Sequence, residues 1–502
     1  FIEGGFPASN PKEAEFFARM ERERLANASL AAFGMTRRKG AAAADDPGLR
    51  ALADTFTPVA TIVGKTWGLH LRKVLRVSRE ENLRMIAESI AFLVAEGKRV
   101  IYDAEHFFDA WTDDPDYAVQ TLRAAADAGA ELLCLCDTNG NTLPQRVEAV
   151  VTEVVAAVGA PVGVHCHNDA DCAVANSLVA VAAGARQVQG TMNGYGERCG
   201  NANLTSIIPG LKLKMGLPVV SDEQLALLTE TAHFVAEVTN MTPWAHQPYV
   251  GRSAFAHKGG LHVAAVEAAP ATFEHVEPDR VGNRQRVLIS ELSGKGAVLH
   301  KANELGFTLE ADDEHVGRIL RRLKQKEHEG FQYEAADASF DLFLHDQLGG
   351  RRPLFRLESF RVIVEKREDG KVVTEATVKV HVEGERIIAT GEGNGPVNAL
   401  DTALRLAIVR KYPHLADIDL VNYKVRILDE NKGTGAVTRV LLDASDGDTT
   451  WGSIGVSENI IEASWQALVD SIEYGMLHGR DEAAGGRPEK ETPVETPGRA
   501  DD

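Results

Sequence analysis

The sequence lacks the features that would place it in a membrane, across one, or on a nucleic acid. No run of eighteen or more apolar residues occurs, and a helix needs about that length to span a bilayer. The first residues do not have the pattern of a secretory signal peptide, so we expect none. The net charge of −19 argues against the basic face of a general nucleic-acid binder. We therefore expect a cytoplasmic protein, although an anionic small-molecule substrate is not excluded.

Cysteine is scarce, and its distribution argues against a disulfide framework. The five cysteines are clustered in one third of the chain and fall mostly in apolar, strand-like runs: Cys134, Cys136, Cys166, Cys172 and Cys199. Their number is odd, and no Cys-x-x-Cys pair occurs. Buried reduced thiols in a cytosolic protein are therefore expected in preference to disulfides or a cysteine-rich metal site.

What the sequence does have is a regular alternation of short apolar strands and amphipathic helices over residues 1–212. Seven strands are predicted, at residues 1–5, 29–36, 60–67, 99–106, 131–138, 161–168 and 185–192. This alternation predicts parallel strands with helices outside them. Seven strands fit either an open doubly wound sheet or a (β/α)₈ barrel without its first βα unit, and periodicity alone does not decide between them.

Polar residues stand where these apolar strands end, which is where (β/α)₈ barrels place their active sites. Asp103 and Glu105 end the fourth strand, and Asn139 follows the fifth. Asp103 and Glu105 share one strand face, and Glu105 is a candidate general acid or base. The alternative for both is an ordinary solvated strand end.

Two histidines in the sixth strand point to a metal. His165 and His167 are two residues apart, so in a strand they face the same side. With Asp169 beside them, they favour a divalent cation over two histidines held by local hydrogen bonds. The segment NGYGERCGN supplies Arg198 and Asn201 to the same face, and an amide oxygen suits a hard metal ion.

The rest of the chain divides into three segments. Residues 213–349 are predicted to form a helical linker subdomain, in which AHKGGLH (256–262) forms a glycine-rich loop. Residues 350–478 contain an internal repeat with the pattern strand-strand-strand-helix in each copy, and Asn398 of the first copy aligns with Asn459 of the second. The charged, Pro/Gly-rich tail 479–502 is predicted to be disordered.

Several stretches resemble a known family. VHCHNDADCAVANSLVAVAAGARQVQGTMNGYGERCGN (164–201) resembles the signature of the 2-isopropylmalate/homocitrate/citramalate synthases, which are DRE-TIM metallolyases. IEGGFPASNPKEAEFF, YDAEHFFD and FAHKGGLHVAAV look like the citramalate synthase branch. The resemblance covers nearly the whole chain. It implies an α/β fold with a TIM-type (β/α)₈ barrel (1–212), the helical linker, and a C-terminal α+β regulatory domain of the leucine type.

The activity implied by the resemblance is a metal-dependent Claisen-type condensation. Acetyl-CoA and pyruvate would give citramalate and CoA, in isoleucine biosynthesis. The alternatives are a 2-isopropylmalate synthase using 2-oxoisovalerate, and a catalytically dead paralogue that senses an amino acid. The resemblance also implies a divalent cation (Mn²⁺, Mg²⁺, Co²⁺ or Zn²⁺), a branched-chain amino acid effector and a homodimer.

The resemblance assigns roles to particular residues. The metal ligands would be His165, His167 and Asn201, and the catalytic residues Glu105 and His262, with His262 assisting from the KGGLH segment. Further candidates for substrate binding are His70, Asp103, Asn139 and Arg198. The aligned asparagines of the repeat, Asn398 and Asn459, are candidate regulatory residues, because the repeat suits the capture of a small zwitterion between its two halves. Phe107, Phe108 and Leu143 are candidates to close a pocket around a small ketone, and Arg37 and Arg38 to bind CoA phosphates.

The sequence also departs from the family pattern. An Arg-Asp-Gly motif, which would supply a further metal ligand and an arginine, is expected before the IEGG strand and is not among these residues. We therefore expect the first βα unit to be missing here, and activity to belong to the full-length protein. Gly68 stands where this branch has Asp, and Asn283 where some relatives have Tyr.

Overall fold

The computed structural model describes residues 1–478, except residues 24, 259, 288–294, 305–306, 308–313, 352, 429–432, 434 and 448. The tail that is predicted to be disordered therefore lies outside the described residues. The chain divides into two compact units: Phe1–Phe255 with Val276–Arg284, and Ala256–His275 with the rest of the chain from Gln285. Each unit is described by itself.

The first unit is built on a seven-stranded parallel sheet. All seven predicted strands are present: β1 (Ile2–Glu3), β2 (Leu30–Met35), β3 (Val59–Lys65), β4 (Arg99–Glu105), β5 (Leu132–Asp137), β6 (Val162–Cys166) and β7 (Gln187–Gln189). Their order in the sheet follows the chain without reversal. A doubly wound sheet would reverse direction at a switch point, so the sheet is of the barrel type. Within the described residues, β1 and β7 each have one strand neighbour.

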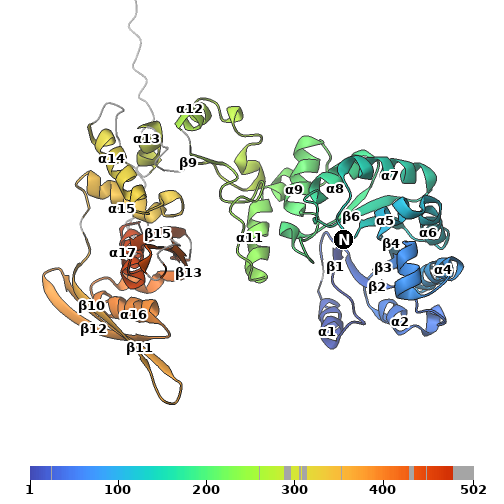
Figure 1. The fold of residues 1–502 in the computed structure, drawn as a ribbon, viewed down its shortest axis with the longest axis horizontal. Coiled ribbons are helices and arrows are strands. Elements are labelled where there is room, and N and C mark those ends of the chain that lie inside the picture. Colours follow the sequence, from blue (N-terminus) through green and yellow to red (C-terminus); the bar gives the residue numbers. More distant parts are fainter. Residues whose placement is uncertain are drawn as a thin grey trace, which may run out of the picture. The chain divides into compact units, whose positions relative to one another are not determined.

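Helices cover the outer side of this sheet, as Figure 1 shows for the green-to-blue half of the chain. They are α1 (Pro11–Met20), α2 (Pro47–Asp54), α4 (Arg79–Ala95), α5 (Phe107–Asp113), α6 (Pro115–Asp127), α7 (Pro144–Ala157), α8 (Ala173–Ala182) and α9 (Leu204–Pro209). The single turn α3 (Gly68–His70) follows β3, and α10 (Asp222–Leu225) and α11 (Leu228–Val238) pack in a separate hydrophobic cluster. Strand residues such as Ile62, Leu133 and Val164 are fully buried beside helix residues such as Ile90 and Val151. Each such side chain contributes about 1.5–3 kcal/mol by leaving water.

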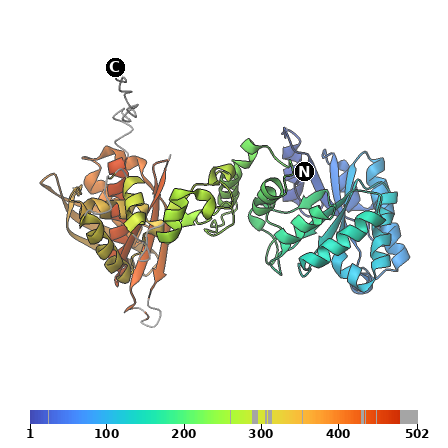
Figure 2. The same ribbon diagram turned by 90° about the horizontal axis from the view of Figure 1, so that it is seen from above.

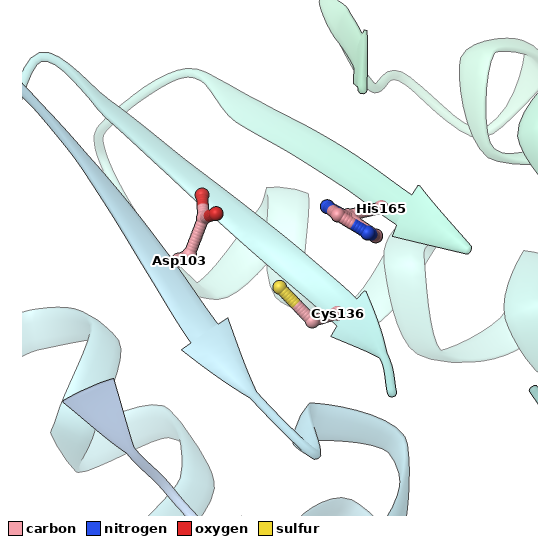
Figure 3. A group of neighbouring side chains, drawn as sticks. All are labelled: Asp103, Cys136 and His165. Atoms are coloured by element: carbon pink, nitrogen blue, oxygen red, sulfur yellow. The ribbon is translucent and has the colours of Figure 1, made fainter. Parts of the chain in front are cut away.

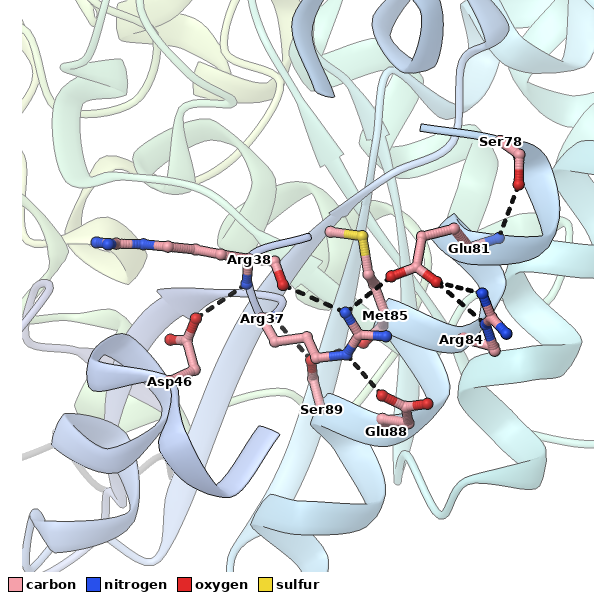
Figure 4. Close-up of polar contacts among 9 residues, drawn as sticks. All are labelled: Arg37, Arg38, Asp46, Ser78, Glu81, Arg84, Met85, Glu88 and Ser89. Carbon is pink, nitrogen blue, oxygen red and sulfur yellow. Dashed lines mark hydrogen bonds and ion pairs between the residues drawn. The ribbon is translucent and has the colours of Figure 1, made fainter. Parts of the chain in front are cut away.

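The first turn of α4 fixes the loop after β2 (Figure 4). Ser78 caps the helix by accepting from the backbone N–H of Glu81. The Glu81 carboxylate accepts a hydrogen bond from the Arg37 guanidinium at 2.9 Å, and the Glu88 carboxylate accepts another from it at 2.6 Å. Arg37 is only 4% exposed, so the expectation that it binds CoA phosphates is wrong. Arg38 is exposed and extends away from this cluster.

The second unit begins with helices. They are α12 (Gly260–Ala268), α13 (Lys295–Glu304), α14 (Glu314–His328) and α15 (Asp337–Gln347), preceded by the short strand β8 (Ala256–His257), which pairs with β9 (Arg286–Val287). The described residues of the AHKGGLH segment include a short strand at its start and the first residues of a helix at its end, where a loop was predicted. Gly259 lies outside the described residues. No helix in the described part of the chain is long and apolar enough to cross a membrane.

The predicted internal repeat is present as two sheet-and-helix halves. The first copy is β10 (Arg356–Lys366), β11 (Val372–Val382), β12 (Glu385–Gly393) and α16 (Pro396–Ile408); the second is β13 (Asp419–Ile427), β14 (Thr438–Ser445), β15 (Thr450–Ser457) and α17 (Ile460–His478). The central strands β11 and β14 alternate buried and partly exposed residues, as expected for antiparallel sheets with one face covered. Figure 2 shows these elements together in orange and red, and residues of both halves share one hydrophobic core.

Candidate active site

The two histidines of β6 and Asn201 lie together at the carboxyl end of the sheet. Nε2 of His165 is 2.9 Å from Oδ1 of Asn201. The rings of His165 and His167 are stacked, with centroids 5.1 Å apart, and the backbones of His167 and Asn201 form an antiparallel bridge. The structure thus brings together the three side chains for which metal ligation was predicted.

The chemistry of this group fits a divalent cation. Nδ1 of His167 is buried and has no hydrogen-bond partner among the described residues. Burial, followed by electrostatic repulsion from His165 and Arg198, lowers the pKa of His167 to about 4. His167 is therefore a neutral imidazole at physiological pH, which is the form that ligates metals.

Glycines let the NGYGERCGN loop bring Asn201 back against β6. Gly200 has φ +90°, a conformation that favours glycine, and a Cβ there would lie 2.0 Å from the carbonyl oxygen of Gly194. A Cβ on Gly196 would lie 2.0 Å from Nδ2 of Asn201. The loop glycines are therefore required by the close approach that places the Asn201 amide.

A second group of possible ligands lies next to the first (Figure 3). One ligand atom each of Asp103, Cys136 and His165 lies within 4.8 Å of the others. The pKa of the Cys136 thiol is raised to about 11: its hydrogen bond with Cys134 lowers it, and burial and the nearby carboxylates raise it by more. Burial likewise raises the pKa of Asp103 to about 7. A neutral thiol is a poor ligand for a hard cation.

Glu105 ends β4 beside a lysine of the neighbouring strand. Its carboxylate forms an ion pair with Lys65, and the hydroxyl of Thr66 donates to its backbone oxygen at 2.6 Å. The Glu105 side chain is 21% exposed. These contacts fix the direction of the carboxylate while leaving it accessible, which suits proton transfer with a bound substrate.

Aromatic rings surround His70 near Glu105. The His70 ring lies 4.4 Å from that of His106 and 5.7 Å from that of Trp67. Burial, with His106 and Lys65 as further causes, lowers the pKa of His70, and its Nδ1 is buried without a hydrogen-bond partner among the described residues. A neutral, orphaned imidazole nitrogen here suits a hydrogen bond with substrate.

The other predicted substrate residues already have protein partners. The Arg198 guanidinium binds both carboxylate oxygens of Asp169, at 2.8 and 2.9 Å. The Asn139 amide donates to Asp109 at 2.9 Å. Asp103 is 4% exposed and accepts from Gln189. Arg198 and Asn139 are exposed and can still reach a substrate, whereas Asp103 faces the interior of the barrel.

Comparison with known proteins decides the family. The first unit matches the HMGL-like model over residues 1–235, and two further models match later segments: the homocitrate synthase post-HMGL domain-like model (249–330) and the LeuA allosteric (dimerisation) domain (334–476). The (R)-citramalate synthase of Geobacter sulfurreducens is 50% identical over 488 residues, covering 97% of this chain and 92% of the relative. The chain belongs to the (R)-citramalate synthase family.

Other members and neighbours of the family agree with this assignment. The (R)-citramalate synthase of Streptomyces coelicolor is 51% identical over 480 residues, covering 95% of this chain and 90% of the relative. The 2-isopropylmalate synthase of Methanocaldococcus jannaschii is 30% identical over 476 residues, covering 94% and 86%. The expected acyltransferase activity, the citramalate synthase branch and the fold class are thereby confirmed. HMGL-like enzymes of this family depend on a divalent metal.

The predicted catalytic residue His262 and the predicted regulatory residues Asn398 and Asn459 lie in the second unit. His262 is on α12, where its ring stacks on that of Phe273 at 4.1 Å. Oδ1 of Asn398, in the first turn of α16, accepts from the backbone of Asn394 at 3.2 Å, and Asn459 caps α17 by accepting from the backbone of Ile461 at 2.8 Å. The two asparagines therefore both stabilise helix starts.

Sequence reasoning missed three residues of this citramalate synthase-family site. Lys65, at the end of β3, was given no role, although it is the partner of Glu105. Cys136 was interpreted as a buried thiol, which it is, but not as a neighbour of His165. Gln189 received no role, although in the printed sequence it directly precedes the GTMNGYGERCGN segment and falls on the same strand face as Gln187.

Proposed function

We propose that the full-length protein condenses acetyl-CoA with pyruvate to give citramalate and CoA, using a divalent cation held by His165, His167 and Asn201. The observation that carries the proposal is the meeting of these donors: His165 Nε2 and Asn201 Oδ1 are 2.9 Å apart beside an unpartnered nitrogen of His167. The printed name of the relatives that are 46–51% identical supports the product.

The residues around the site suit each part of the condensation. When bound, a divalent cation supplies Lewis-acid polarisation of a 2-oxo acid carbonyl. Glu105, oriented by Lys65, removes a proton from the acetyl methyl group. That carbon then forms a bond to the ketone carbon, the C=O π bond breaks, and the ketone oxygen takes up a proton to become the hydroxyl of the product. Nδ1 of His70, which has no partner among the described residues, forms a hydrogen bond with the substrate. Water finally cleaves the thioester and releases CoA. An assisting role for His262 is proposed from the family resemblance alone.

The substrate side chain is accommodated beside α5 and α7. A cavity of about 610 Å³ is lined by residues including Trp67, Phe108 and Leu143. Phe107 is fully buried in the hydrophobic core, with 0% of its surface exposed. The expectation that it lines the pocket is therefore wrong. Trp67, Phe108 and Leu143 form the apolar part of this lining, and we propose that they contact the ketone substituent.

We expect pyruvate to be preferred over 2-oxoisovalerate. One methylene in an apolar pocket changes kcat/KM by about 10- to 200-fold, so the two additional methyl groups of 2-oxoisovalerate should lower kcat/KM at least about tenfold. The measurement is thiol release with a panel of 2-oxo acids at fixed acetyl-CoA. Equal or greater kcat/KM with 2-oxoisovalerate would assign the chain to the alternative, 2-isopropylmalate synthesis.

We further propose that the C-terminal repeat forms a homodimer and binds a branched-chain amino acid, isoleucine or leucine, as feedback inhibitor. A cavity of about 490 Å³ beside the start of α16 is lined by Asn398 and by apolar residues such as Val397, Leu420 and Tyr423. The match to the LeuA allosteric (dimerisation) domain supports both parts. A cytoplasmic location is also proposed.

Replacing Asn398 by alanine should raise the concentration of effector that gives half-inhibition by about tenfold, because a hydrogen bond to a charged group contributes about 1.5–3 kcal/mol. The measurement is the inhibition curve for isoleucine and for leucine. The matched control is Thr402→Ala, one turn along α16, whose hydroxyl bonds the backbone of Asn398 outside the cavity lining. Equal shifts in both variants would contradict an effector contact at Asn398.

A further inference from the structure

Gln189 connects His165 to a buried carboxylate. It lies on β7 directly beside His165 of β6 in the parallel register. Its Oε1 is 2.8 Å from Nδ1 of His165, and its Nε2 donates to Oδ1 of Asp103 at 2.8 Å. Asp103 comes from β4 and is 4% exposed. One amide side chain thus bridges an imidazole and a carboxylate inside the barrel.

The direction of this bridge determines which nitrogen of His165 carries the hydrogen. The NH₂ group of Gln189 faces Asp103, to which it donates, and its carbonyl oxygen faces His165. A carbonyl oxygen can only accept, so Nδ1 of His165 is the donor. In a neutral imidazole the lone pair is then on Nε2.

The other side of His165 is fixed in the same way. Nδ2 of Asn201 donates to the backbone oxygen of Tyr195 at 3.3 Å, so Oδ1 of Asn201 faces Nε2 of His165. With Nδ1 protonated, the 2.9 Å contact places two acceptors against each other. Two acceptors repel at this distance unless a proton or a cation lies between them. The contact therefore has the polarity of an ion-binding pair.

We propose that Gln189, anchored by Asp103, is a positioning residue that holds His165 in the Nδ1–H tautomer and so presents Nε2 as a metal ligand. The inference rests on the metal site of the proposed function and adds to it the group that orients one ligand. Outer partners of ligating histidines fix the tautomer and the ring orientation, and their loss costs about 10- to 100-fold in metal affinity.

The first test is metal binding by the chelator-stripped chain, followed by calorimetric titration with Mn²⁺. Gln189→Leu should weaken binding about 10- to 100-fold, because Nδ1 loses its acceptor. Gln187→Leu is the matched control: the same substitution, on the same strand face of β7, at an amide without a contact to His165 in the described structure. Equal affinities for Gln189→Leu and the unsubstituted protein would overturn the inference.

The second test reads the tautomer itself, without metal or activity, by ¹⁵N NMR of histidine-labelled protein, with the His165 signals assigned by their loss in His165→Gln. The unsubstituted protein and Asp103→Asn, whose Oδ1 still accepts from Gln189, should show a protonated Nδ1 and a bare Nε2. Asp103→Leu should give a mixture of tautomers. A bare Nδ1 in the unsubstituted protein would overturn the inference.

The two tests separate this inference from the proposed function. If the unsubstituted chain binds Mn²⁺, and His167→Ala does not, while Gln189→Leu binds as tightly as the unsubstituted chain, only the positioning role fails. If Mn²⁺ binding does not depend on His167, the proposed metal site fails, and the NMR tautomer still decides whether Gln189 orients His165.

Discussion

Replacing His167 by alanine should lower CoA release from acetyl-CoA and pyruvate by about 10³-fold in the full-length protein. The substitution removes a neutral imidazole whose buried nitrogen has no other partner among the described residues. Lewis-acid polarisation by a cation lowers the activation free energy by several kcal/mol. Each step of about 1.4 kcal/mol at 25 °C changes the rate tenfold. The measurement is thiol release followed at saturating acetyl-CoA.

Two controls make this result specific. His233→Ala removes an exposed histidine of α11 and should leave the rate unchanged. Chelation of the unsubstituted protein should abolish thiol release, and added Mn²⁺ should restore it, whereas Mn²⁺ should not restore His167→Ala. Thiol release that survives both chelation and His167→Ala would contradict the metal-dependent mechanism.

Glu105→Gln should lower kcat by about 10²- to 10⁴-fold, the range for loss of a positioned general acid or base. Glutamine keeps the shape of the side chain and its place beside Lys65 but cannot accept a proton. KM for pyruvate should change much less, because the substitution acts on proton transfer. A useful separate readout is exchange of the acetyl methyl hydrogens with solvent, which should slow in parallel with kcat.

Glu131→Gln is the matched control for Glu105→Gln. Glu131 also forms an ion pair with a basic residue, Arg99, at 2.5 Å, but it precedes β5 and so lies at the opposite end of the sheet from Glu105. Its loss should leave kcat unchanged. A comparable fall of kcat in both variants would indicate a general effect of removing an ion pair, and would argue against a chemical role for Glu105.

Local patterns in the sequence were enough to predict the strands and the repeat. Each strand of the first unit is a short apolar run ended by polar residues, and in parallel sheets buried on both faces such runs are continuous. The second unit repeats alternating strands followed by an amphipathic helix, a pattern set by periods of two and 3.6 residues. The two histidines of β6 follow from the same rule, since His165 and His167 share one strand face.

Contacts between distant strands could not be predicted in this way. Gln189 and Asp103 are 86 residues apart, and their hydrogen bond depends on how the sheet curves, which no local pattern specifies. Arg37 was expected to bind a ligand because basic turns often do, yet α4 places Glu81 and Glu88 against it. The start of α12 was interpreted as a loop because glycines are frequent in loops, although the apolar residues that follow favour a helix.

The central claim is that His165, His167 and Asn201 together hold the cation that binds the 2-oxo acid. Anomalous diffraction from crystals of the full-length protein grown with Mn²⁺ and pyruvate tests it most directly. The expected result is one manganese peak bounded by these three side chains, with the carboxylate and ketone oxygens of pyruvate on its open side. A peak enclosed instead by Asp103, Cys136 and His165, or none near His167, would contradict the account.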